Sequence, residues 1–429
     1  MEDRPRDAPA SAALGSWLAR CGPGNGGRYG PRPMTVQLAP IPDHVALPPG
    51  FRAAGLHCGL KKNQQLDLGL LLADAPVAAA ALYTRNELVG AHIAVCRDHL
   101  ARSGGMVRAV LVNARNANCA TGAPGIAAAR TCCAELAQRL GCPVEQVVMA
   151  STGPIGAPLP TERIVQHLDA LLDQASRDGA MDFARAIMTT DTYPKAALHR
   201  ADGCTSTGFA KGSGMIHPDM ATMLGFLLTD GRSVDAAATA GLLQRVAARS
   251  FHRVTVDGDT SPNDTLLLLA SGSSPAGPDA VEHAITQLSQ TLARTVAADG
   301  EGATRLVTIE VRGARTEAEA SHVGRVIATS PLVKTAVAGR DPNWGRILSA
   351  AGRAGVSFPT ERARVWVGTA DVYSGGIPHP EHEPEAHRHL VDDVLVTLGI
   401  DLAVGSAAAD VWTCDLTKDY VQINADYRS

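Results

Sequence analysis

The stretch "KGSGMIHPDMATMLGF", residues 211–226, combines features of a tight turn with those of a buried strand. A Gly-Ser-Gly segment and Pro218 come before the pair Ala221-Thr222, and an apolar run follows directly. Glycine and proline are residues that tight turns favour, whereas a short apolar run between turn signals is typical of a buried strand. The pattern predicts a turn that places the hydroxyl of Thr222 at the mouth of a buried strand.

A threonine hydroxyl at this place suggests a nucleophile only if a base lies beside it. One known solution is a threonine at a chain N-terminus, whose own α-amine acts as the base and titrates near ~8. Because Thr222 is internal, the chain would first have to break between Ala221 and Thr222, by attack of the hydroxyl on the carbonyl of Ala221 and hydrolysis of the resulting ester. Without further signals, Thr222 is better explained as the first residue of a strand, where threonine is common.

Such chemistry also needs preorganised donors for a developing oxyanion. The segment "STGPIG", residues 151–156, follows a predicted strand and offers the hydroxyl of Thr152 and the N–H of Gly153. The alternative is an ordinary β-turn, since Gly-Pro often marks a loop.

The rest of the chain predicts a layered mixture of strands and helices. Apolar residues alternate at 305–313, and a continuous apolar run occupies 264–272, which predicts two strands. Helical spacing of apolar residues occurs at 125–141, 161–172 and 281–296, with Thr161 as the expected cap of the second helix. The elements follow no regular βαβ order, so we expect an α/β or α+β arrangement of sheets covered by helices.

The charge, apolar runs and cysteine content of the chain exclude some classes of function. A net charge of -4 without a basic face argues against nucleic acid, and no apolar run approaches the ~20 residues of a membrane helix. Nine cysteines without a C-x-x-C pair indicate reduced thiols and a cytoplasmic protein. Residues 1–44 are rich in Pro, Gly and Arg and are interpreted as a disordered or mis-annotated extension. Lysine is rare, which makes each one notable; it occurs only at 61, 62, 195, 211, 334 and 418.

No metal site is predicted. Asp257, Asp259 and Asp264 do not have the spacing of an EF-hand. The histidine-rich stretch 379–389 could hold a metal, but a solvent-exposed loop explains it better.

Several motifs in one order resemble a known family, the ornithine acetyltransferases, which are glutamate N-acetyltransferases of arginine biosynthesis. They cover most of the chain from about residue 45 onward and are "NARNANCATG" (113–122), "STGPIG" (151–156), "IMTTDTYPK" (187–195), "KGSGMIHPDMATML" (211–224), "TVDGDTSPNDT" (255–265), "DGEGAT" (299–304), "SPLVKTAVAGRDPNWGRI" (330–347) and "CDLTKDYVQINADYRS" (414–429).

The resemblance implies a fold and a reaction. The fold would be an αββα sandwich of the N-terminal-nucleophile hydrolase type, as in ornithine acetyltransferases and related aminopeptidases, with a smaller C-terminal subdomain. Self-cleavage would give an α chain, 45–221, and a β chain, 222–429, assembled as an α2β2 heterotetramer. Thr222 would accept the acetyl group of N2-acetyl-L-ornithine and pass it to L-glutamate in a ping-pong reaction without a cofactor. Whether acetyl-CoA also serves as donor stays open.

The resemblance also implies site residues. Thr152 and Gly153 would stabilise the oxyanion. Contacts with the substrate carry over to Thr189, Lys211, Thr222, Glu301, Asn424 and Ser429. A lysine ammonium suits the substrate α-carboxylate, a glutamate can pair with the distal ammonium of ornithine, and an asparagine can bond amide or carboxylate groups. The alternative for Lys211 and Glu301 is a pair of ordinary surface ion pairs.

Three positions differ from the family pattern. Ser429 stands where threonine is usual, Arg115 stands where many members have a small residue, and Arg340 replaces a typically acidic residue. These differences keep open a relative that acts on another acyl amino acid. A separate alternative is an amidase or aminopeptidase on the same scaffold, in which water replaces glutamate as the acceptor; the Lys211, Glu301 and Asn424 set favours the transferase. A non-catalytic binding protein is a third, which the retained Ala221-Thr222 pair argues against.

Overall fold

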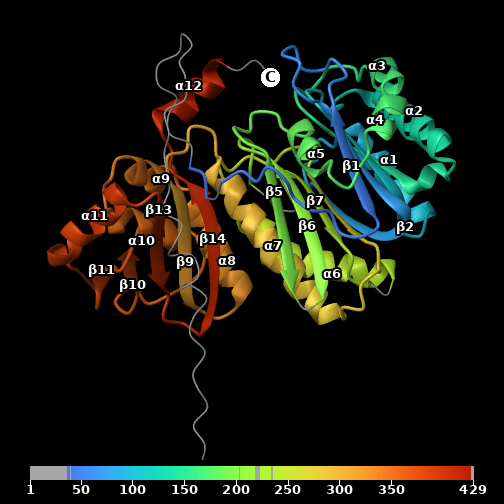
Figure 1. Ribbon diagram of the computed structural model, residues 1–429. Helices are drawn as coiled ribbons and strands as arrows, with labels where there is room; N and C mark the ends of the chain where they lie inside the picture. The colour runs from blue at the N-terminus through green and yellow to red at the C-terminus, as the bar shows by residue number, and fades with distance from the viewer. Residues whose placement is uncertain (1–35, 39, 202, 218–222, 233–234, 427–429) are drawn as a thin grey trace, which may run out of the picture.

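The chain forms two sheets covered by helices. The structure, a computed structural model, describes residues 36–38, 40–201, 203–217, 223–232 and 235–426. The larger sheet has eight strands, and the smaller has six and belongs to the C-terminal part (Figure 1). The predicted mixed α/β class with a smaller C-terminal subdomain is therefore confirmed.

The larger sheet has the strand order β4-β3-β2-β8-β7-β6-β5, and β1 pairs with β2. Helices α1, α2 and α5 share one core with it, and α6 and α7 share a second core on its other face. Its strands are β1 Phe51–Leu56, β2 Leu68–Tyr83, β3 Met106–Ala114, β4 Val147–Thr152, β5 Lys195–Ala201, β6 Cys204–Lys211, β7 Leu224–Thr229 and β8 Thr265–Ala270. Its helices are α1 Ala91–Arg102, α2 Gly122–Leu140, α3 Thr161–Gln166, α4 Leu168–Asp173, α5 Ala180–Ala186, α6 Ala236–Ala248 and α7 Pro278–Ala298.

Strands β7 and β8 are buried on both faces, which explains their continuous apolar sequence. Phe226 lies in the first core, where Phe183 of α5 packs edge-on against it with ring centroids 5.4 Å apart. Leu227 lies in the second core. At Gly208 of β6, a Cβ atom would approach Leu292 of α7 to 2.6 Å, so glycine allows this helix to pack closely.

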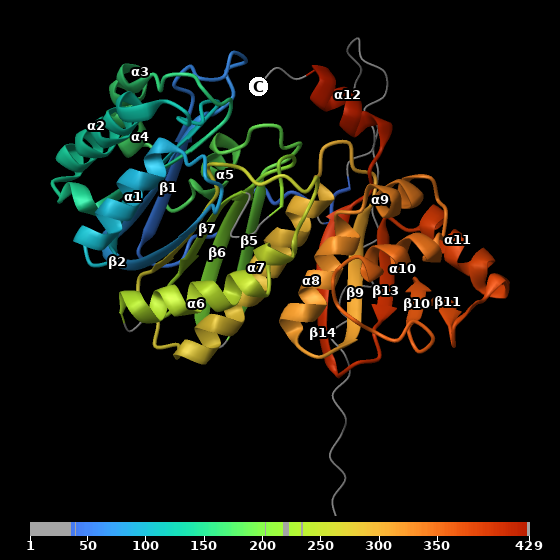
Figure 2. The same ribbon diagram turned by 180° about the vertical axis from the view of Figure 1, so that it is seen from behind.

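The smaller sheet has the order β12-β11-β10-β13-β9-β14. Helices α8, α9, α10 and α11 form one core with it. Helix α7 contacts β5 and β6 of the larger sheet and also β9 and β14, so it lies between the two sheets (Figures 1 and 2). The elements are β9 Leu306–Ala314, α8 Glu317–Ala328, α9 Pro331–Ala338, α10 Trp344–Gly352, β10 Arg364–Val367, β11 Ala370–Ser374, β12 Ile377–Pro378, α11 Glu383–Asp392, β13 Leu395–Asp401, β14 Ala407–Cys414 and α12 Lys418–Asp426.

Two local predictions are wrong. The histidine-rich stretch 379–389 is not a loop: it forms a short 3-10 turn and most of α11, whose Ala386 and Leu390 are buried one helical turn apart. The predicted helix at 161–172 is split into α3 and α4, and Thr161 does not cap it. At the break, the ring of His167 bonds to the carbonyl of Arg163 at 2.7 Å, the acceptor that a continuous helix would use.

The segment 1–44 is described only at 36–38 and 40–44. Val36 is buried in the core that holds α7, and its carbonyl oxygen accepts a hydrogen bond from the Tyr193 hydroxyl at 3.1 Å. Residues 36–38 thus lie on the folded body. Among the described residues, none of the helices is long and apolar enough to cross a bilayer.

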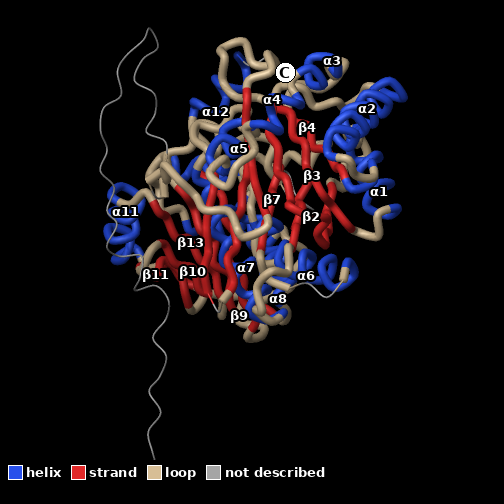
Figure 3. Tube along the Cα trace, turned by 45° about the vertical axis from the view of Figure 1, so that its right-hand side comes forward, coloured by secondary structure: helices blue, strands red, loops and turns tan. Residues whose placement is uncertain are grey.

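The turn between β6 and β7 contains the predicted cleavage point, although Ala221 and Thr222 themselves lie outside the described residues. The two strands pair antiparallel, with Lys211 opposite Leu224. Strand β7 pairs parallel with β8, and β8 pairs with β2. Strands β7 and β8 therefore come after the predicted cut but lie between β2 and β6, which come before it. Figure 3 shows β7 in the same sheet as β2, β3 and β4.

Candidate active site

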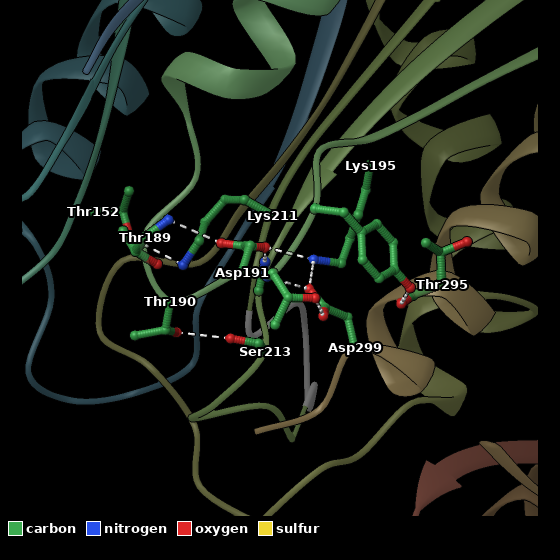
Figure 4. A network of polar contacts seen from close by, with 12 residues as sticks. Thr152, Thr189, Thr190, Asp191, Lys195, Lys211, Ser213, Thr295 and Asp299 are labelled. Atoms are coloured by element: carbon green, nitrogen blue, oxygen red, sulfur yellow. Dashed lines mark hydrogen bonds and ion pairs between the residues drawn. The ribbon is translucent and has the colours of Figure 1, made fainter. Parts of the chain in front are cut away.

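Lys211 and Thr152 meet at the ends of two strands of the larger sheet. Lys211 ends β6, Thr152 ends β4, and the Lys211 ammonium donates a hydrogen bond to the Thr152 hydroxyl at 3.3 Å (Figure 4). Burial lowers the pKa of Lys211, and the Asp191 carboxylate opposes that shift. The sheet thus brings together a predicted substrate contact and a predicted oxyanion residue that lie 59 positions apart in the sequence.

Gly153 follows Thr152 in a conformation that a side chain would not tolerate. Its φ is +141°, and a Cβ atom would lie 2.4 Å from the backbone carbon of Arg115 and the backbone nitrogen of Asn116. The Asn116 N–H donates to the Thr152 carbonyl at 3.0 Å, which fixes the two loops against each other. The turn therefore has one position relative to the "NARNANCATG" loop, as an oxyanion site requires.

Replacing Gly153 with alanine should displace this turn. Because the clash is with backbone atoms, the donors would move away from the reacting carbonyl, and we expect kcat to fall by about 10²-fold, the cost of losing an oxyanion donor. Gly156→Ala is the matched control, since Gly156 also has a positive φ, +89°, but its Cβ would meet nothing within 4 Å. Equal kcat values for the two variants in a steady-state assay would contradict an oxyanion role for this turn.

A buried triad of charged side chains, Lys195, Asp191 and Asp299, contacts the segment that follows Lys211. The Lys195 ammonium donates to Asp191 at 2.6 Å and to Asp299 at 2.5 Å, and all three side chains are fully buried (Figure 4). Asp191 Oδ1 also accepts the N–H of Gly212 at 2.7 Å. Burial opposes the charge of Asp191, but the ammonium groups of Lys195 and Lys211 outweigh it and hold the pKa of Asp191 below its ordinary value.

Thr189 is fixed by the same carboxylate, because its N–H donates to Asp191 Oδ2 at 2.9 Å. The neighbouring Thr190 hydroxyl bonds to the Ser213 hydroxyl at 2.7 Å. The Ser213 carbonyl in turn accepts the N–H of Glu301 at 2.9 Å. The segments that carry Thr189, Lys211 and Glu301 are thus joined by hydrogen bonds.

Glu301 lies in the loop after α7, and its carboxylate accepts a hydrogen bond from the Asn424 amide of α12 at 2.9 Å. A Cβ at Gly214 would approach this carboxylate to 2.5 Å, so the glycine leaves room for it. Glu301 is half-buried and Asn424 is exposed. These two predicted substrate contacts therefore meet at the rim of the cluster.

The acidic "TVDGDTSPNDT" stretch supports the glycine-rich turn. Asp257 accepts the N–H groups of Met215 and Ile216 at 2.6 and 2.8 Å. Asp264 is buried, and its Oδ2 has no hydrogen-bond partner among the described residues. Burial raises the pKa of Asp264 well above its ordinary value. Within the described part of the chain, no group of three or more potential ligands is arranged for a metal ion.

The cluster therefore contains Thr152, Gly153, Thr189, Lys211, Glu301 and Asn424, whereas Thr222 and Ser429 lie outside the described residues. Sequence reasoning did not assign Asp191, Lys195 or Asp299 to the site. The rarity of lysine in the chain was the available signal for Lys195. Asp191 and Asp299 lie within the quoted motifs 187–195 and 299–304, but nothing in the sequence indicated that Asp299 pairs with Lys195, which is 104 positions away.

An ammonium at one end of this cluster and a carboxylate at the other complement a small molecule that carries a carboxylate and a distant ammonium. The nearby Thr152-Gly153 turn is suited to a developing oxyanion. The described part of the cluster is compatible with acyl transfer to or from an amino acid.

Comparison with known proteins supports this interpretation. A model of the ArgJ family matches residues 52–429. The arginine biosynthesis bifunctional protein ArgJ of Thermus thermophilus is 45% identical over 384 residues, 89% of this chain and 99% of the relative. The protein of the same name from Parasynechococcus marenigrum is 42% identical over 389 residues, 89% of this chain and 95% of the relative.

Two crystal structures also align. ArgJ from Bacillus halodurans is 38% identical with a TM-score of 0.45, and the alignment covers 47% of this chain and 98% of that one. The ornithine acetyltransferase of Mycobacterium tuberculosis, solved with ornithine, is 35% identical with a TM-score of 0.40 and covers 42% of this chain and 96% of that one. The family model and the full-length relatives together establish that this chain belongs to the ArgJ family.

Proposed function

We propose that this protein transfers the acetyl group of N2-acetyl-L-ornithine to L-glutamate, giving ornithine and N-acetylglutamate. The observation that carries the proposal is the occurrence of two hydrogen-bonded pairs, Lys211 with Thr152 and Asn424 with Glu301, in a chain of the ArgJ family. Lys211 would bind the α-carboxylate of the substrate, and Glu301, held by Asn424, would bind the distal ammonium of ornithine.

The proposed reaction begins with cleavage between Ala221 and Thr222. The Thr222 hydroxyl attacks the Ala221 carbonyl, the peptide C–N bond breaks, and water hydrolyses the ester. The freed α-amine then accepts the hydroxyl proton as Thr222 attacks the acetyl carbonyl of acetylornithine. The amide C–N bond breaks, the proton goes to the leaving amine of ornithine, and acetyl-Thr222 remains. The amine of glutamate then takes the acetyl group.

The proposal extends to the assembly. Cleavage would leave an α chain, 45–221, and a β chain, 222–429, and we expect two of each in the active particle. Ser429 would keep the hydroxyl contact of the usual threonine. The curated relatives carry the name "bifunctional", which supports testing acetyl-CoA as a second acetyl donor.

The intact mass of the purified protein, measured after brief exposure to N-acetylornithine without glutamate, tests the proposal. Two fragments divided before Thr222, the second with one acetyl group that glutamate removes, are the expected result. Acetate release that glutamate does not suppress would indicate an amidase. Two fragments without acetyl would indicate another acyl donor. A single uncut chain would reject the mechanism.

The pH dependence of KM should report the ammonium of Lys211. The charged form exists below its pKa and is lost above it, and burial lowers this pKa relative to an ordinary lysine near ~10.4. KM for N-acetylornithine should therefore rise with pH, starting below the pH at which an exposed lysine would deprotonate. Initial rates from pH ~6 to ~10 measure it, and a KM that stays constant to pH ~10 would contradict the assignment.

A further inference from the structure

The buried triad of Lys195, Asp191 and Asp299 costs free energy to form. All three side chains are fully buried, and the desolvation of charges often outweighs their mutual attraction. Replacement of a buried ion triad by apolar residues of similar volume is often neutral or stabilising. The triad is therefore better explained by the geometry that it imposes than by the stability that it adds.

The Lys195–Asp191 pair fixes the segments next to Lys211. Lys195 Nζ holds Asp191 at 2.6 Å, and the two oxygens of Asp191 accept the N–H of Gly212 at 2.7 Å and that of Thr189 at 2.9 Å. Gly212 follows Lys211 directly, and Thr189 is itself a predicted substrate contact. One carboxylate therefore sets the positions of two segments that face the substrate.

The Lys195–Asp299 pair fixes the start of the loop that carries Glu301. Lys195 Nζ holds Asp299 Oδ2 at 2.5 Å, and the same carboxylate accepts the N–H of Thr192 at 3.0 Å and also its hydroxyl. Asp299 is the residue after α7 and lies two positions before Glu301. Its position therefore determines where the loop that carries Glu301 leaves the helix.

The triad also spans the predicted cut. Lys195 and Asp191 come before Thr222, and Asp299 comes after it. Once the chain is cleaved, the ammonium of Lys195 would be an ionic contact between the two fragments. It is joined through Asp191 to the residue after Lys211 and through Asp299 to the loop that carries Glu301.

We propose that Lys195 is a positioning residue, which sets the distance between Lys211 and Glu301 by holding Asp191 and Asp299 at once. The proposal rests on the proposed function, since it concerns the two groups that would bind the ends of acetylornithine. Lys195 itself does not touch the substrate in this view.

The test compares Lys195→Met with Lys334→Met. Lys334 is a matched control, because it is also buried and its ammonium also has several partners, among them the Thr413 hydroxyl at 2.8 Å, but it lies in the smaller subdomain. Both variants should melt at lower temperature than the wild type. Only Lys195→Met should lower kcat/KM for N-acetylornithine, by about 100-fold and mainly through KM, because a shift of about 1 Å in a binding group has such an effect.

A second variant covers the case in which Lys195→Met does not fold. Lys195→Met combined with Asp299→Asn leaves one buried carboxylate instead of two. If the double variant folds and cleaves but keeps the low kcat/KM, positioning is supported. If it regains wild-type kcat/KM, Lys195 only neutralises charge and the proposal is overturned.

The wild-type measurement separates this proposal from the proposed function. A wild type that transfers no acetyl group rejects the function, and the positioning role falls with it. An active wild type with an equally active Lys195→Met, or with an equal loss of kcat/KM in Lys334→Met, rejects the positioning role alone.

Discussion

The Thr222→Ala variant should remain a single uncut chain and should lose acetyl transfer. The substitution removes both the hydroxyl that would attack the Ala221 carbonyl and the hydroxyl that would carry the acetyl group. Loss of a covalent nucleophile typically costs about 10⁴-fold or more in rate. Denaturing electrophoresis and intact mass measure the cleavage, and a coupled assay of N-acetylglutamate formation measures the transfer.

Thr222→Ser is the control for this experiment, because it keeps a hydroxyl at the same position. It should still be cleaved and should retain measurable transfer. Cleavage of Thr222→Ala at the same bond, or transfer by the uncut variant at more than about one hundredth of the wild-type rate, would contradict the N-terminal nucleophile.

The Lys211→Met variant should have kcat/KM for N-acetylornithine lowered by about 10- to 150-fold, the range expected for one hydrogen bond to a charged group. Methionine keeps much of the length of the side chain but cannot pair with a carboxylate. Cleavage before Thr222 should persist, since the α-carboxylate of the substrate has no part in it. Steady-state kinetics with acetylornithine as the varied substrate provide the measurement.

Lys62→Met, a change at an exposed lysine, is the control and should match the wild type. If Lys211→Met kept its KM for acetylornithine and lost only kcat, the lysine would act on the transition state rather than on the substrate carboxylate. That outcome would contradict the assignment made here.

Elements with strong periodicity were predictable from the sequence. The alternation of Val307, Ile309 and Val311 indicated β9, and these side chains all lie in one core. The apolar spacing along 281–296 indicated α7. Such patterns are local consequences of burial and need no knowledge of the partner that covers them.

Features that depend on single side chains were not predictable. The break between α3 and α4 arises because the His167 ring takes a backbone acceptor, although the apolar spacing continues through it. The histidine-rich segment was assigned to a loop from its polar composition, but Ala386 and Leu390 provide enough buried surface for a helix. Composition alone does not reveal so short an apolar face.

The candidate site illustrates the same limit. The Thr152-Gly153 turn is predicted from its turn residues after a strand, whereas the substrate role of Lys211 is predicted from the resemblance to a known family. The carboxylates that orient them come from a loop before β5 and from the end of α7. The contact of Asp299 with Lys195 exists only once the sheet and α7 have packed, so no local pattern predicts it.

The strand order of the larger sheet has a consequence for the cleaved protein. If the chain is cleaved before Thr222, the two polypeptides would be interleaved through backbone hydrogen bonds, because β7 and β8 lie between β2 and β6. After denaturation, the cleaved protein would have to recover by a bimolecular reaction whose rate depends on protein concentration. The uncut Thr222→Ala chain would recover by a first-order reaction. Cleavage would thus make refolding slow at low protein concentration. The lifetime of the mature protein would then depend on the activation barrier to unfolding of the larger sheet.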